Sequence, residues 1–123
     1  ETLKIPGFSM LPGSETKLLH GLQNGASGII SAVTNVTYSL AKKVYDDFKN
    51  NIEQSANNKL CAVRKVFDDT GNLISALHSF MSVKDKSYER LLPPLILLSS
   101  EKQKELLNKL KELNFIPRKN IAA

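Results

Sequence analysis

The chain has 123 residues, 41% of them hydrophobic and 24% charged, a composition typical of a folded globular protein rather than a disordered chain. No apolar run approaches the roughly 20 residues that a membrane-spanning helix needs, and no secretory leader opens the sequence, so we expect a cytoplasmic protein with no membrane contact. The net charge is +5, but basic residues alternate with acidic ones, which argues against nucleic-acid binding.

Two short apolar runs in the first half of the chain predict β-strands. They are "FSML" at residues 8–11 and "GIISAV" at residues 28–33, and continuous apolar runs of this length are typical of strands buried on both faces of a parallel sheet. The stretch between them, "SETKLLHGLQNG", predicts a helix with Ser14 as its N-cap and Gly25 just beyond its end. The pattern therefore predicts a strand-helix-strand crossover.

Helical spacing dominates the rest of the sequence. A buried stripe predicts a helix after the second strand: Leu40, Ala41, Val44, Tyr45 and Phe48. Residues 1–50 would then form two consecutive β/α units. Three further helices are predicted within residues 51–123, from Ala56 to Phe67, from Leu73 to Met81 and from Glu101 to Leu113.

Two parallel strands do not complete a domain, because their outer edges stay unpaired and a sheet this small gives the helices little surface to pack on. The sequence also lacks an initiator Met and opens with "ETLKIPGF", as if a helix were ending. We therefore expect an α/β fold in which this chain is the C-terminal portion of a longer protein.

Two stretches resemble the pyruvate-dependent class I aldolases, the superfamily of dihydrodipicolinate synthase, N-acetylneuraminate lyase and the archaeal 2-keto-3-deoxygluconate aldolases. "PGSETKLLHGLQNGASGIISAVTNV" resembles the seventh and eighth β/α units of their TIM barrel, and "LLPPLILLSSEKQKELLNKLKEL" resembles their "RPPL.PL" segment and final helix. Leu92 stands where the family usually has Arg, and Glu15 stands where Asp is commoner. The Gly-Ser-acid order is most similar to the archaeal enzymes. The resemblance implies the end of a β/α barrel, followed by a helical extension that packs on the barrel or on a neighbouring subunit.

The resemblance assigns substrate binding to Gly13, Ser14, Glu15 and Ala32. In a β/α barrel these residues lie at the carboxyl ends of strands, where the active site is built. Gly13 would let the substrate approach the backbone, Ser14 would donate to substrate oxygens, and Glu15 would accept hydrogen bonds from sugar-acid hydroxyls. Ala32 would leave room for the substrate chain. From the residues alone, Gly13 and Ser14 fit an ordinary turn and helix cap equally well.

The implied reaction is reversible cleavage of a 2-keto-3-deoxygluconate-type sugar acid to pyruvate and an aldehyde through a Schiff base. In the family the imine-forming Lys and the Tyr acid/base precede the matched segment, so this chain holds neither and is expected to be inactive alone. Lys84, in "SVKDKSYE", is a decoy, because no buried strand precedes it to desolvate its amine. The imine is the electron sink, so no cofactor or metal is implied.

The expected partners are pyruvate, the sugar acid, the remaining barrel segment of the same protein and further subunits of a homotetramer. Within the enzyme class, dihydrodipicolinate synthase or N-acetylneuraminate lyase activity remains an alternative. From another class, the leucine stripes and basic surface also fit a non-catalytic helical interaction module.

Overall fold

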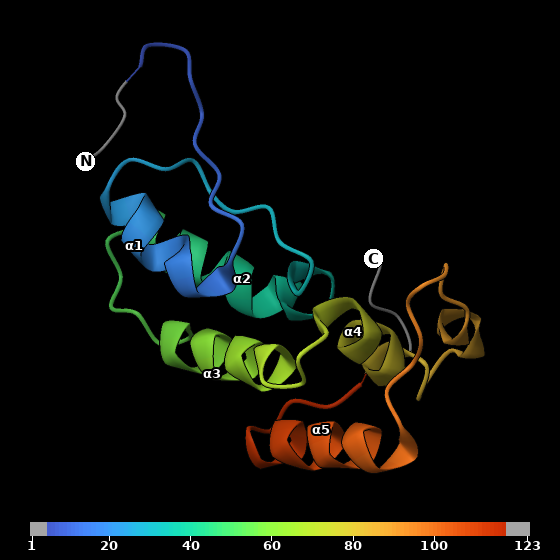
Figure 1. Ribbon diagram of the computed structural model, residues 1–123. Coiled ribbons are helices and arrows are strands. Elements are labelled where there is room, and N and C mark those ends of the chain that lie inside the picture. The colour runs from blue at the N-terminus through green and yellow to red at the C-terminus, as the bar shows by residue number, and fades with distance from the viewer. Residues whose placement is uncertain (1–4, 118–123) are drawn as a thin grey trace. The chain divides into compact units, whose positions relative to one another are not determined.

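The computed structural model describes residues 5–117, and within this range the chain forms helices and no β-strand (Figure 1). In chain order the elements are η1 (Glu15–Lys17), α1 (Leu18–Gln23), α2 (Thr34–Lys49), α3 (Asn57–Asp68), α4 (Leu73–Met81), η2 (Lys86–Glu89) and α5 (Ser100–Glu112), where η marks a 3-10 helix. The chain divides into two compact units, Glu1–Cys61 and Ala62–Ala123, and the boundary falls inside α3. The predicted division at residue 50, between barrel units and a helical extension, stays a prediction.

The two predicted strands are the main difference between expectation and structure. Residues 8–11 and 28–33 have no regular secondary structure, and the prediction of formed β/α units is wrong for this chain. Phe8 is 58% exposed and Ile30 is 70% exposed, so neither side chain is buried as a strand between two helix layers would require. A pair of parallel strands with both outer edges unpaired is too small to be stable, which explains why the extended segments form no ladder.

The predicted helices are confirmed, with ends that differ by a few residues. The helix predicted after Ser14 begins as η1 and continues as α1, and Gly25 follows it with a positive φ of 89°. Glycine adopts this left-handed conformation at little steric cost, so it suits the residue just past a helix. The short helix η2 was not predicted. None of the helices within the described range has the length and apolar character that crossing a membrane requires.

The first unit is held together by the apolar faces of α1 and α2, which contact each other (Figure 1). Its core cluster consists of Leu18, Leu22, Ala41, Val44, Ala56 and Leu60. Leu18 and Leu22 are spaced one helical turn apart, as are Ala41 and Val44, so each helix presents one apolar stripe. This packing fixes the turn before η1 relative to the start of α2.

The second unit is organised around α4, which contacts both α5 and η2. Phe80 is 1% exposed, and its ring lies edge-on to Phe67 at a centroid distance of 5.5 Å and stacked on Phe115 at 5.6 Å. Ser79 adds polar contacts, because its Oγ accepts from the Leu98 backbone N–H at 2.9 Å and its carbonyl accepts from Gln103 Nε2 at 2.6 Å. Aromatic packing and these hydrogen bonds hold α5 against α4.

The N-cap of α4 offers a test of the second unit. The Asn72 side chain accepts a hydrogen bond from the Ser75 backbone N–H at 3.0 Å. Asn72→Ala is expected to lower the free energy of unfolding by about 1 kcal/mol, the usual cost of losing a side-chain cap. Asn72→Asp keeps an acceptor and should recover most of that stability in a urea titration. Equal losses for the two variants would show that the cap contributes nothing.

Candidate functional site

The most distinctive polar feature of the first unit is the buried carboxylate of Glu15. Glu15 is 0% exposed, although it is the first residue of η1 and follows directly on a loop. Ser31 Oγ donates to Oε2 at 2.9 Å, and Thr34 Oγ1 donates to Oε1 at 2.7 Å. Each carboxylate oxygen therefore accepts one hydroxyl hydrogen, and such charge-assisted bonds offset the cost of burying the group. We call these three residues the Glu15 cluster.

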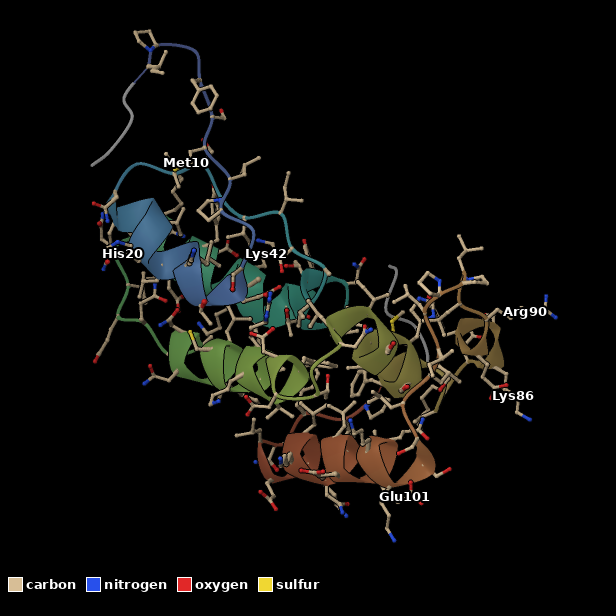
Figure 2. All side chains as sticks on the ribbon, in the orientation of Figure 1. Met10, His20, Lys42, Lys86, Arg90 and Glu101 are labelled. Carbon is tan, nitrogen blue, oxygen red and sulfur yellow. The ribbon has the colours of Figure 1, made fainter. Side chains whose placement is uncertain are left out.

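The two turns that form the cluster are joined through the backbone. The Ser27 N–H donates to the Met10 carbonyl at 2.9 Å, and the Ile30 N–H donates to the Pro12 carbonyl at 3.2 Å. Met10 is labelled on the extended segment that leads into the turn (Figure 2). The partners advance together along the chain, so the segments lie side by side in the parallel sense that adjacent barrel strands adopt. The cluster begins directly after these paired residues.

The other predicted substrate residues lie in the same two turns. Gly13 is exposed, and a Cβ added to it would meet only the Ile30 carbonyl oxygen at 3.8 Å, so packing within this chain does not require glycine there. Ser14 is half-buried and makes no capping hydrogen bond, so its predicted capping role is wrong; its Oγ instead lies 3.0 Å from Thr16 Oγ1. Ala32 is half-buried, next to Ser31. Substrate contact by these residues stays a prediction.

Sequence reasoning missed Ser31 and Thr34 as functional residues. Thr34 was recognised only as the residue after the second apolar run, and Ser31 was counted as part of that run. The signal that could have found them is their position, because polar residues at the carboxyl ends of adjacent parallel strands meet at one edge of a sheet. Glu15 follows the first run at the same edge.

An open cavity of about 320 Å³ lies along α2 in the first unit. Its lining is mainly apolar, and Thr34 belongs both to this lining and to the Glu15 cluster. The lining residues are Leu18, Gly28, Ile29, Thr34, Tyr38, Ala41, Lys42, Tyr45 and Asp46. Lys42, labelled in Figure 2, forms an ion pair with Asp46 at 2.5 Å. Thr34 is thus accessible from open space on one side while it holds the buried carboxylate on the other.

The remaining chemically capable side chains do not join the cluster as metal ligands. His20 is exposed on α1, where Figure 2 labels it, and its Nε2 lies 3.5 Å from Asn24 Nδ2. Lys84 is exposed between α4 and η2, consistent with its rejection as an imine-forming residue. Among residues 5–117, no three His, Cys, Asp or Glu side chains come together in a way that could hold a metal ion.

Cys61 reports on the charge of Glu15. Burial raises the pKa of the Cys61 thiol, and the negative charge of Glu15 raises that pKa further. A raised pKa keeps the thiol protonated to higher pH, so Cys61 is unsuited to act as a nucleophile near neutral pH.

This shift predicts slow alkylation. We expect iodoacetamide to modify Cys61 more slowly than a free cysteine at about pH 8, since only the thiolate reacts. Glu15→Gln removes one cause of the shift and should lower the Cys61 pKa, which speeds alkylation while burial still holds the pKa above the free value. Mass spectrometry of the Cys61 peptide across a pH series measures both effects, and an unchanged profile in the variant would contradict a charged Glu15 beside the thiol.

Comparison with known proteins decides the family. The sequence model of the Dihydrodipicolinate synthetase family matches residues 2–113, which covers both compact units and the whole Glu15 cluster. The chain belongs to the dihydrodipicolinate synthetase family. Members of this family are lyases related to the class I aldolases. No curated protein and no solved structure shows significant similarity to the chain.

Proposed function

We propose that this chain supplies substrate-binding turns to a Schiff-base aldolase that cleaves 2-keto-3-deoxygluconate-type sugar acids to pyruvate and an aldehyde. The family match supports the reaction class. The observation that supports the substrate class is the Glu15 cluster, which places a carboxylate and two hydroxyl groups where two extended segments end. Gly13, Ser14 and Ala32 lie in the same turns and complete the proposed substrate-binding set.

In this proposal the imine-forming Lys and the Tyr acid/base belong to a barrel segment outside this chain. The Lys amine adds to the C2 carbonyl of the substrate and expels water. The protonated imine then accepts the electron pair of the C3–C4 bond as the aldehyde leaves, and hydrolysis of the imine releases pyruvate. The turns of this chain orient the hydroxyl-bearing carbons of the substrate during these steps.

The remaining barrel segment is also the proposed structural partner. Residues 8–11 and 28–33 would become the seventh and eighth strands when further strands pair with their edges, since pairing supplies the hydrogen bonds that two isolated segments lack. Phe8 and Ile30, exposed in this chain, would be buried by the helices of the complete barrel. We further propose that the assembled enzyme is a cytoplasmic homotetramer.

Reductive trapping tests the reaction. The protein containing this chain and its barrel segment is incubated with pyruvate and sodium borohydride, and intact mass spectrometry is expected to show one reduced pyruvate adduct per chain. Protein treated with borohydride alone is the control. This chain alone is expected to gain no adduct. If the complete protein also stays unmodified, the aldolase proposal fails, and a non-catalytic interaction module becomes the better explanation.

The substrate class requires a separate measurement. Cleavage rates are compared for 2-keto-3-deoxygluconate, N-acetylneuraminate and the condensation of pyruvate with aspartate semialdehyde. The proposal expects the highest kcat/KM for the first. Preference for either of the others would retain the family's chemistry and replace the proposed substrate.

A further inference from the structure

The Glu15 cluster has a buried side and an accessible side. Glu15 is fully buried, whereas Ser31 and Thr34 are half-buried, and Thr34 also lines the open cavity along α2. The two hydroxyl groups therefore lie between the carboxylate and the surface. Any molecule that approaches from outside meets the hydroxyl groups first.

The carboxylate fixes the hydrogen-bonding direction of both hydroxyls. A carboxylate has no hydrogen to donate, so Ser31 and Thr34 each direct their single hydroxyl hydrogen towards Glu15. Only oxygen lone pairs then remain for an incoming group. Thr34 Oγ1 can accept a hydrogen bond from a ligand but cannot donate one without giving up its 2.7 Å bond to the carboxylate.

This polarity selects the chemistry of the ligand. A hydroxyl group on a polyol chain carries the hydrogen that such an acceptor needs. The oxygens of a fully ionised phosphate or carboxylate carry none and would meet lone pairs and a buried negative charge. A buried polar group that lacks its partner is costly, so sites of this kind discriminate strongly between hydroxylated and deoxy ligands.

We propose that Ser31 and Thr34 are specificity-determining residues that accept hydrogen bonds from hydroxyl groups on the aldehyde-derived half of the substrate. Glu15 is a positioning residue that orients these two hydroxyls and does not itself touch the substrate. This inference rests on the proposed aldolase function and assigns the side chains that read the substrate hydroxyls.

The test compares two aldehydes with the same three-carbon skeleton. The complete protein condenses pyruvate with glyceraldehyde, which carries two hydroxyl groups, or with propionaldehyde, which carries none, and the ratio of the two kcat/KM values measures hydroxyl recognition. Thr34→Val removes the hydroxyl at nearly constant volume and is expected to lower the ratio about 3- to 10-fold, the effect of one hydrogen bond. Ser31→Ala should act similarly, and Thr34→Ser should retain the wild-type ratio.

Two further variants separate recognition from folding. Thr16→Val changes an exposed threonine outside the cluster and should leave the ratio unchanged. Glu15→Gln keeps one oxygen acceptor but adds N–H donors, so one hydroxyl must reverse and point its hydrogen outward. The glyceraldehyde rate should therefore fall while the propionaldehyde rate is retained. Added to Ser31→Ala and Thr34→Val together, Glu15→Gln should not change the ratio further, because its effect passes through those hydroxyls.

Each outcome is informative. Equal loss of both aldehyde rates in the Ser31 and Thr34 variants indicates a purely structural role and overturns the inference. A further drop when Glu15→Gln joins the double variant indicates direct contact between Glu15 and the substrate, which also overturns it. An unchanged ratio beside normal pyruvate trapping refutes the inference alone. Absence of pyruvate trapping in the wild-type protein removes the proposed function itself.

Discussion

Glu15→Ala is expected to lower both the stability and the sugar-acid activity of the complete protein. The substitution removes the acceptor of two hydroxyl hydrogens, from Ser31 and Thr34, and leaves space where a fully buried side chain was packed. Leaving buried or half-buried polar groups without a partner costs about 1–3 kcal/mol. The melting temperature should therefore fall, and kcat/KM for the sugar acid should fall about 10-fold or more because the hydroxyl-reading groups lose their orientation.

The matched control is Glu53→Ala, which makes the same change at an exposed residue of the first unit and should alter stability by no more than about 0.5 kcal/mol. Pyruvate trapping should be nearly unchanged in Glu15→Ala, because imine formation does not involve the hydroxyl-bearing half of the substrate. Loss of trapping in a variant that remains folded by circular dichroism would contradict the assigned role.

Phe80→Ala is expected to have the largest effect on stability of any single substitution considered for this chain. The Phe80 ring is 1% exposed and contacts the rings of Phe67 and Phe115 on two sides. Truncating a buried Phe to Ala usually costs about 3–5 kcal/mol, from lost apolar burial and the cavity left behind. Urea titration followed by circular dichroism should show a large drop in the midpoint of unfolding.

Ile74→Ala provides the comparison on the same helix. Ile74 lies on α4 and is 38% exposed, so its truncation should cost clearly less than that of Phe80. Similar losses at the two positions would show that the aromatic cluster is not the centre of the second unit. Phe80→Leu should recover part of the loss, because it refills much of the cavity without restoring the ring contacts.

The helices could be predicted from the sequence because their determinants are local. The apolar stripe that contains Ala41 and Val44 predicted the buried face of α2, and the range from Leu73 to Met81 predicted α4. Helical hydrogen bonds join residues four apart, so a short window of sequence contains most of the information needed. The two aldolase-like stretches likewise predicted the family that the match over residues 2–113 established.

The strands and the details of the site depended on non-local contacts. Residues 8–11 and 28–33 have the composition of strands, but a strand forms only when neighbouring strands satisfy its backbone groups, and sequence composition does not supply those neighbours. Glu15 was recognised from its turn as a substrate ligand, yet its burial and its bonds to Ser31 and Thr34 join residues 16 and 19 positions apart.

The sequence by itself thus determined the helices, the position of the turn and the kinship with pyruvate-dependent aldolases. Only the tertiary structure decided which way the Glu15 side chain points and which hydroxyl groups it orients. The physical reason is that a buried carboxylate must find its hydrogen-bond donors wherever packing brings them, and here α1 against α2 brings them from the far side of the crossover.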